Sequence, residues 1–307
     1  MTVSRADVEA AAARIAGRVR ETPVMRTTIE GVDLVLKLEL LQHTGSFKPR
    51  GAFSNVLARP EIPDAGLIAA SGGNHGLAVA YVAGRLGVSA EIFVAEVTPE
   101  VKRKRIEALG ATVVVAGPLY HDALEASRVR ASATGALEIH AYDHPDTVAG
   151  QGTMAMELAR QVPDLTRVIM AVGGGGFIGG AAAWFGGEID LIAVEPRGSA
   201  ALHHALAAGH PVDVDVDSVA GDSLGARSIG PIPFEPIRRG VTRSVLVTDD
   251  AIVAAQRLAW RELRLVVEPG GATALAAVLS GQVEVRPGDV TVVVVCGANA
   301  DPRALID

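Results

Sequence analysis

The sequence predicts an α/β protein built from mostly parallel strands flanked by helices. Along the 307 residues, segments with the composition of strands alternate with segments whose apolar residues recur at helical spacing. Glycine-rich stretches stand between a strand and a helix, where open α/β proteins collect their binding sites. Because parallel strands need crossover connections, which are usually helices, this alternation favours parallel sheets.

The amino-terminal part begins with a predicted helix. Ser4 and Asp7 have the spacing of a capping box, and apolar residues follow at helical spacing to about Glu21. Residues 33–40 alternate in polarity, which predicts a strand, and a helix over 52–57 is ended by the prolines that follow. Further strands are predicted at 66–70, 90–95 and 112–115, and helices at 74–86, 99–109 and 119–133.

The same alternation continues to the end of the chain, with no repeat of fixed period and no low-complexity linker. Strands are predicted at 167–172, 191–194 and 290–295, and helices at 147–161, from 177, at 199–208, at 249–265 and at 272–279.

Composition narrows the class of protein. A hydrophobic content of 49% and a charged content of 21% are those of a globular protein. The net charge of −7, with no basic run longer than 102–105, argues against nucleic acid as a partner. Charges interrupt the amino terminus, so no signal peptide is expected, and the one cysteine, Cys296, fits a reducing compartment. We therefore expect a cytoplasmic protein.

One uncharged window, residues 168–187, is long enough to cross a bilayer. It contains eight glycines, four of them consecutive, which would leave the backbone poorly organised in lipid. We interpret it as a strand, a loop and a helix, and predict no membrane association.

The first chemical motif is Gly45–Gly51, which follows the predicted strand 33–40 and contains Lys48. Apolar neighbours or nearby cations lower the pKa of a lysine, and its free amine can then form a Schiff base with an aldehyde. Phe47 and Pro49 supply apolar surroundings, and Arg50 adds positive charge. The alternative is an ordinary surface lysine in a glycine-rich turn.

The second motif is Ser71–Gly76, between a predicted strand and a predicted helix. Its small residues expose backbone N–H groups at a helix N-terminus, which suits a carboxylate. The alternative is a plain turn with Asn74 as the helix cap.

The third motif, Gly173–Gly180, also follows a strand and opens a helix, so its N–H groups can hold a phosphate. The same glycines satisfy a dinucleotide fingerprint, with Glu195 at the place of a ribose-binding acid. A nucleotide-binding oxidoreductase is therefore an alternative that this loop by itself leaves open.

The fourth motif is Val293–Asn299, a buried strand that ends in small residues and contains Cys296. A single cysteine in an apolar strand is usually a core residue. No neighbouring His or Asp pattern indicates how its thiol would be activated as a nucleophile.

In this order the four motifs resemble those of pyridoxal-phosphate (PLP) enzymes of the tryptophan-synthase-β fold, also called fold type II. The serine/threonine dehydratase and serine racemase branch is the most similar. The resemblance implies two open, mostly parallel sheets, with PLP in the cleft between a large and a small domain. The large domain would comprise residues 1–59 and 145–307, the small inserted domain residues 60–144, and the protein would be a homodimer.

The resemblance also implies roles for particular residues. Lys48 would bind PLP and act as the catalytic base, with Phe47 beside it in the cofactor site. Asn74 would face the ring hydroxyl of the cofactor, and Cys296 its pyridine nitrogen. The cofactor phosphate would be held by the glycines of the third motif, which are Gly173, Gly174, Gly175 and Gly176. The substrate carboxylate would be held by the second motif through Ser71, Gly73 and His75.

Two departures from the family pattern are informative. Serine racemases carry a second serine, the acid/base of the opposite face, where this chain has Gly72, so elimination is favoured over racemisation. Some relatives bind a cation with two carboxylates, and here the second position is Ala201, so no metal is predicted. The histidines at 203, 204 and 210 are interpreted as helix-surface residues. Residues 222–225 and Tyr142 are expected at the edge of the site.

The expected activity is that of a PLP-dependent ammonia-lyase. It would remove water from L-threonine or L-serine and give 2-oxobutanoate or pyruvate plus ammonia. The alternatives on the same fold are elimination from a hydroxyaspartate or a diamino acid, and β-replacement. The distant alternative is the nucleotide-binding oxidoreductase.

Overall fold

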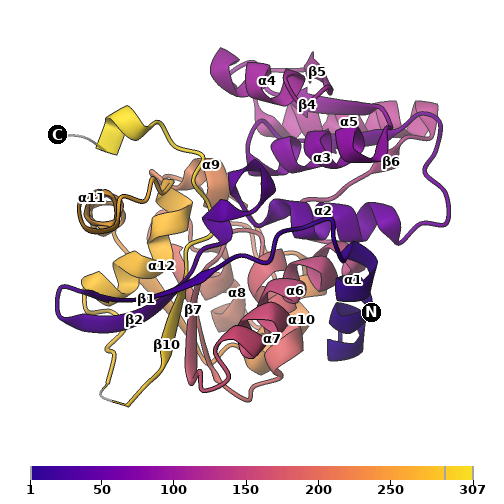
Figure 1. Ribbon diagram of the computed structural model, residues 1–307. Helices are drawn as coiled ribbons and strands as arrows, with labels where there is room; N and C mark the ends of the chain where they lie inside the picture. Colours follow the sequence, from indigo (N-terminus) through magenta and orange to yellow (C-terminus); the bar gives the residue numbers. More distant parts are fainter. Residues whose placement is uncertain (1, 287, 306–307) are drawn as a thin grey trace.

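The computed structural model describes residues 2–286 and 288–305 and contains two sheets (Figure 1). The larger has the strand order β1-β2-β10-β7-β8-β9, and the smaller β5-β4-β3-β6. All described strand pairs are parallel except β1 with β2. The predicted α/β class with mostly parallel sheets is confirmed.

The strands of the larger sheet come from both ends of the chain, and those of the smaller sheet from one continuous stretch between them. The larger sheet contains β1 (Val24–Ile29), β2 (Val32–Lys37), β7 (Arg167–Ala171), β8 (Asp190–Pro196), β9 (Arg243–Val247) and β10 (Thr291–Val294). The smaller sheet contains β3 (Leu67–Ala70), β4 (Ala90–Val94), β5 (Thr112–Val115) and β6 (Leu137–Glu138).

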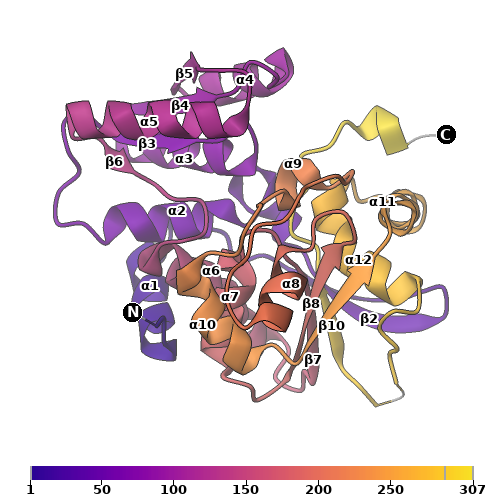
Figure 2. The same ribbon diagram turned by 180° about the vertical axis from the view of Figure 1, so that it is seen from behind.

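Helices cover both faces of each sheet (Figures 1 and 2). The helices that precede the smaller sheet in the chain or connect its strands are α1 (Arg5–Ile15), α2 (Lys48–Leu57), α3 (Asn74–Leu86), α4 (Glu100–Glu107) and α5 (Tyr120–Thr134). The remaining α-helices are α6 (Pro145–Gln161), α7 (Gly176–Phe185), α8 (Ala201–Ala208), α9 (Gly221–Leu224), α10 (Pro231–Gly240), α11 (Asp249–Leu263) and α12 (Pro269–Leu279). Short 3₁₀ turns are η1 (Glu39–Leu41), η2 (His43–Gly45) and η3 (Pro302–Leu305).

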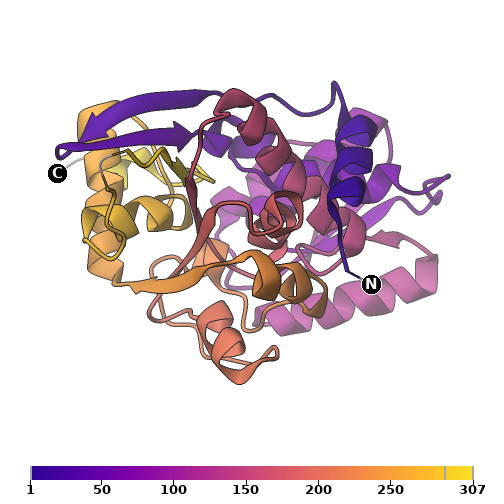
Figure 3. The same cartoon turned by 90° about the horizontal axis from the view of Figure 1, so that it is seen from below.

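Helix α2 connects the two halves of the molecule. It packs against α3 of the smaller sheet and against α6 beside the larger one (Figure 1). Seen from below, the β1–β2 hairpin forms one border of the larger sheet (Figure 3). The central strands β7, β8 and β10 are apolar and buried, as expected for parallel strands covered on both faces.

Several predicted boundaries are wrong. The first helix keeps its capping box of Ser4 and Asp7 but ends at Ile15, well before Glu21. The helix predicted over 52–57 begins earlier, at Lys48, because Pro49 suits the first turn of a helix. Gly51 lies inside this helix, where close packing requires a glycine. A β-carbon on Gly51 would lie 2.5 Å from the side-chain nitrogen of Gln151. The predicted strand 33–40 runs over 32–37 and then passes into η1, and the predicted helix 199–208 begins at Ala201.

Five further strands and α-helices were not predicted, among them the short helix α9. Strands β1, β6 and β9 are short or partly exposed, so they lack a strong alternation. Helix α10 contains Pro231, Pro233 and Pro236, which argue against a helix in sequence.

The uncharged window 168–187 forms β7, the glycine loop and α7, as predicted. Within residues 2–286 and 288–305, no helix is both long and apolar enough to cross a membrane.

Candidate active site

The first, third and fourth motifs follow β2, β7 and β10, which are neighbouring strands of the larger sheet. These three motifs therefore lie at one edge of the sheet. Because these strands are parallel, their carboxyl ends lie on the same side. Ser46 forms a bridge with Gly297, and the N–H of Phe47 donates to the carbonyl of Cys296 at 3.4 Å. The ring of Phe47 also stacks on Phe177, with centroids 3.9 Å apart. The lysine loop therefore contacts both other motifs directly.

Lys48 is the first residue of α2, and its Nζ donates to the carbonyl oxygen of Ala141 at 2.9 Å. Loss of hydration lowers the pKa of Lys48 to about 8, against the electrostatic influence of Cys296 and Glu268, which acts to raise it. An appreciable fraction of this lysine is thus a free amine near neutral pH. The contribution predicted for Arg50 is wrong, since its charge is neutralised by carboxylates on the other side of the loop.

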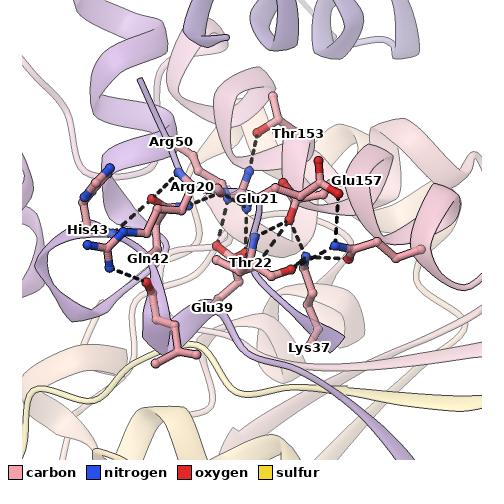
Figure 4. A network of polar contacts seen from close by, with 12 residues as sticks. Arg20, Glu21, Thr22, Lys37, Glu39, Gln42, His43, Arg50, Thr153 and Glu157 are labelled. Carbon is pink, nitrogen blue, oxygen red and sulfur yellow. Dashed lines mark hydrogen bonds and ion pairs between the residues drawn. The ribbon is translucent and has the colours of Figure 1, made fainter. Parts of the chain in front are cut away.

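Arg50 belongs to a buried cluster of balanced charge behind the lysine loop (Figure 4). Its guanidinium donates to both oxygens of Glu39 at 2.8 and 2.7 Å, and to Glu157 at 2.9 Å. Lys37 pairs with the same Glu157 and donates to the carbonyl of Thr22 at 2.7 Å. Burial opposes the charge of Arg50, but Glu39 and Glu157 together outweigh burial and raise the pKa of Arg50. This cluster joins β2, η1, α2 and α6 around the base of Lys48.

The loop Ser71–Gly76 connects β3 to α3, and close packing leaves no room for a β-carbon on Gly72 or Gly76. A β-carbon on Gly76 would lie 2.0 Å from the carbonyl oxygen of Ser71. Gly73 donates its N–H to Ser71 Oγ at 3.2 Å, and the first N–H groups of α3 follow. Since early helical N–H groups lack partners within the helix, the loop offers donors to an anion.

His75 contributes to this loop through its backbone. Its ring is buried, and Nε2 lies 2.7 Å from the carbonyl oxygen of Ile139. Burial, followed by the charge of Lys48, lowers the pKa of His75 to about 3. The ring is therefore neutral and turned into the core, so an anion near Ser71 would meet the His75 N–H and no imidazolium.

The tetraglycine loop follows β7 and caps α7. Gly175 has a φ of +90°, a conformation that favours glycine, and α7 begins at Gly176. The ring of Tyr142 lies against this loop, because a β-carbon on Gly174 would come within 2.4 Å of it. The loop 222–225 lies between the two glycine motifs, with Ser223 near Gly173 and Asp222 near Gly73. Both border the site, as expected.

Cys296 is buried, and its Sγ lies 3.5 Å from the carbonyl oxygen of Gly270. Burial, reinforced by Glu268, raises the pKa of the Cys296 thiol, so it is neutral. Such a thiol is a poor nucleophile, in agreement with the sequence-based interpretation.

Two residues at the centre of the site, Glu268 and Asn299, were not given a role from sequence. Glu268 Oε1 accepts a hydrogen bond from Asn74 Nδ2 at 2.6 Å, and Asn299 Nδ2 donates to Asn74 Oδ1 at 2.6 Å. The only signal in sequence was Glu268-Pro269-Gly270-Gly271, an acid directly before a helix start. Their meeting with Asn74 depends on how the two sheets face each other.

Glu195, the acid of the dinucleotide alternative, is buried at the end of β8. Its two oxygens accept the N–H groups of Leu202 and His203 at 2.7 and 2.8 Å. Burial raises the pKa of Glu195 to about 8. Glu195 thus caps α8. Within the described part of the chain, no three His, Cys, Asp or Glu side chains lie close enough together to hold a metal ion.

A lysine of lowered pKa, two glycine loops at helix N-termini and a neutral thiol are the groups expected in a fold type II PLP enzyme. The sequence matches the family described as pyridoxal-phosphate dependent enzymes over residues 15–297, and the chain belongs to this family. The predicted family and cofactor are confirmed, and the dinucleotide interpretation of the tetraglycine loop is set aside.

Curated relatives include dehydratases. The chain is 41% identical to the chloroplastic biosynthetic threonine dehydratase of Arabidopsis thaliana over 80% of this chain and 42% of that protein. It thus spans less than half the length of that relative. It is also 36% identical to the phenylserine dehydratase of Ralstonia pickettii, over 94% of this chain and 91% of that protein.

Among solved structures, maize serine racemase superposes with a TM-score of 0.93 at 31% identity. The superposition covers 99% of this chain and 96% of the maize protein. The predicted fold type is therefore confirmed.

The residues present fit the cofactor of this family by their chemistry. The Lys48 amine suits the aldehyde of PLP, and the N–H groups at the start of α7 suit its phosphate. The neutral thiol of Cys296 suits a pyridine nitrogen that carries no proton.

Proposed function

We propose that this chain is an ammonia-lyase that removes water from a small β-hydroxy amino acid, L-threonine or L-serine. The products are 2-oxobutanoate or pyruvate, plus ammonia. The observation that carries the proposal is the convergence of the Lys48 loop with the strand end that contains Cys296 and with the glycine loop at the start of α7. The similarity to dehydratases supports the same class of reaction.

In this proposal Lys48, Asn74, Cys296 and the glycines of residues 173–176 hold PLP. When bound, the cofactor withdraws electron density from the α-carbon of the amino acid and so acidifies its α-hydrogen. Ser71, Gly73 and the His75 N–H orient the substrate carboxylate.

Lys48 would be freed from the cofactor when the amino group of the substrate takes its place, and its amine would then remove the α-proton as general base. The β-hydroxyl leaves with a proton as water, and the electron pair of the broken C–H bond forms the new double bond. The released enamine takes up one water molecule and gives the 2-oxo acid and ammonia. Keeping Cys296 neutral favours prompt loss of the β-substituent.

The choice of threonine or serine is supported by the relatives named threonine dehydratase. A cavity beside Asn74 is lined by residues of the Ser71 loop, α4, α9 and the Glu268–Asn299 pair.

The test is release of 2-oxo acid from PLP-loaded protein, with L-threonine, L-serine, phenylserine and 3-hydroxyaspartate as substrates. We expect kcat/KM to be largest for threonine or serine. If phenylserine or 3-hydroxyaspartate is preferred by about tenfold or more, the proposed substrate is wrong while the ammonia-lyase class stands. If none releases 2-oxo acid, the proposed reaction is wrong.

We expect the Gly72→Ser variant by itself to form no D-serine from L-serine. A β-carbon on Gly72 would lie 2.5 Å from Thr98 Cγ2, so the side chain of Thr98 fills the space that the racemase serine would need. Chiral chromatography of the reaction mixture measures this directly.

The matched variants are Gly72→Ser combined with Thr98→Ala, in which the space is vacated, and Thr98→Ala by itself. D-Serine produced by the single Gly72→Ser variant at the level of the double variant would contradict the steric explanation.

Three further expectations remain proposals. They are the division into residues 1–59 with 145–307 and 60–144, the homodimer, and the cytoplasmic location. Light scattering on the purified protein tests the dimer.

A further inference from the structure

A buried carboxyl lies at the junction of the two halves and has no part in the proposed chemistry. Glu268 directly precedes α12, and only 5% of its surface is exposed. Its Oε1 accepts from Asn74 Nδ2 at 2.6 Å, and its Oε2 accepts the N–H of Asn299 at 3.2 Å. Both oxygens of this side chain are therefore committed to groups of the candidate site.

The amide of Asn74 is in turn held at both of its polar atoms. Asn299 Nδ2 donates to Asn74 Oδ1 at 2.6 Å and to the carbonyl of Thr44 at 2.8 Å. Arg105 of α4 donates to Asn299 Oδ1 at 2.5 Å. An amide nitrogen carries two hydrogens, so Asn74 keeps one donor after its bond to Glu268. The direction of that remaining N–H depends on Glu268 and Asn299.

We propose that Glu268 is a positioning residue that sets, through Asn74, the hydrogen bond offered to the ring hydroxyl of PLP. Gain or loss of the Glu268 proton then changes that bond. The inference rests on the role proposed for Asn74 and is independent of which amino acid is the substrate.

The groups around Glu268 support a change of its protonation state within the physiological pH range. Burial raises the pKa of Glu268 to about 7, against the hydrogen bonds from Asn74 and Asn299. Asp222 of α9 raises the pKa further, whereas Lys102 of α4 lowers it. Lys48 and Cys296 face the same carboxyl from α2 and from the end of β10.

The two protonation states hold Asn74 differently. Above pH 7 the carboxylate accepts a charge-assisted bond from Asn74, and below pH 7 the neutral acid accepts a weaker one. A glutamine at this position would accept only one of the two N–H groups, and its own NH₂ would face the other donor.

The experiment is the visible absorption spectrum of PLP-loaded protein without substrate, between about pH 5.5 and about pH 9. In the wild type we expect a transition with its midpoint near the pKa of Glu268, about 7. In Glu268→Gln the transition is absent, and the dissociation constant of PLP rises about tenfold because a bond to a charged group is lost.

Two further variants complete the test. Glu268→Asp keeps a titrating carboxyl but moves it away from Asn74, so the transition persists with a displaced midpoint. Glu91→Gln removes the carboxylate that pairs with Arg130 on the outer side of the smaller sheet and is the matched control. Its spectrum should titrate as the wild type does.

A transition that persists unchanged in Glu268→Gln would overturn the proposal. So would a wild-type spectrum without a transition between about pH 6 and about pH 8. If Glu268→Gln does not fold, an unchanged midpoint in Glu268→Asp overturns it equally. Because no substrate is present, failure of the proposed dehydratase reaction would leave this result interpretable.

Discussion

The Lys48→Ala variant loses turnover by about a thousandfold or more, because the general base and the cofactor anchor are removed together. PLP bound to this variant is lost on dialysis, and the purified protein is colourless. The measurement is release of 2-oxo acid at saturating PLP, together with the absorption spectrum after dialysis. Borohydride reduction followed by peptide mass analysis of the wild type should place the label on Lys48.

Lys48→Arg is the control, since it keeps the positive charge and most of the volume but offers no free amine near neutral pH. We expect it to be as inactive as Lys48→Ala while folding normally. A label on another lysine, or activity retained in either variant, would show that Lys48 is not the reactive amine.

The Arg50→Met variant is expected to lose about 3–5 kcal/mol of unfolding free energy, because the carboxylates of Glu39 and Glu157 would share only Lys37 in a buried site. The buried charged residues of this cluster are Arg50, Lys37, Glu39 and Glu157, so the loss of one cation leaves an uncompensated buried charge (Figure 4). Denaturant unfolding monitored by circular dichroism measures the change. Activity should fall as well, since this cluster positions the start of α2.

The matched control is Arg130→Met, which removes the exposed partner of Glu91 and should have little measurable effect on stability. Arg50→Met combined with Glu39→Gln should be less destabilising than the sum of the single changes, because the two side chains are in contact. A loss in Arg50→Met no larger than in Arg130→Met would contradict a stabilising role for the cluster.

Much of the candidate site could be predicted because its motifs are local. Asn74, the glycines 173–176 and Cys296 each follow closely on a strand, and Lys48 follows β2 after η1 and η2. Strands can be recognised from the pattern of polarity over a few residues. A lysine or a glycine loop carries its own chemical signal. The parallel order of β2, β10 and β7 then brings three of these motifs to one edge.

The elements missed from sequence owe their conformation to neighbours. Strand β1 is formed by pairing with β2 along its whole length, and helix α10 retains an interior proline because it is packed against α7. The start of α2 was predicted after Gly51, whereas this glycine lies inside the helix. A glycine is required at this position because Gln151 of α6 lies close to it. Intrinsic propensity is outweighed by packing in each case.

The order of residues along the chain is enough to predict the class of fold, the family and a set of candidate site residues, since each depends on side chains that are close together in sequence. The surroundings of these residues are set by folding. The charge that Arg50 was expected to lend Lys48 is neutralised by Glu39 and Glu157, and the amide of Asn74 is held by Glu268 and Asn299. These partners lie far apart in the chain. Their hydrogen bonds and pKa values follow from burial and distance, which exist only after folding.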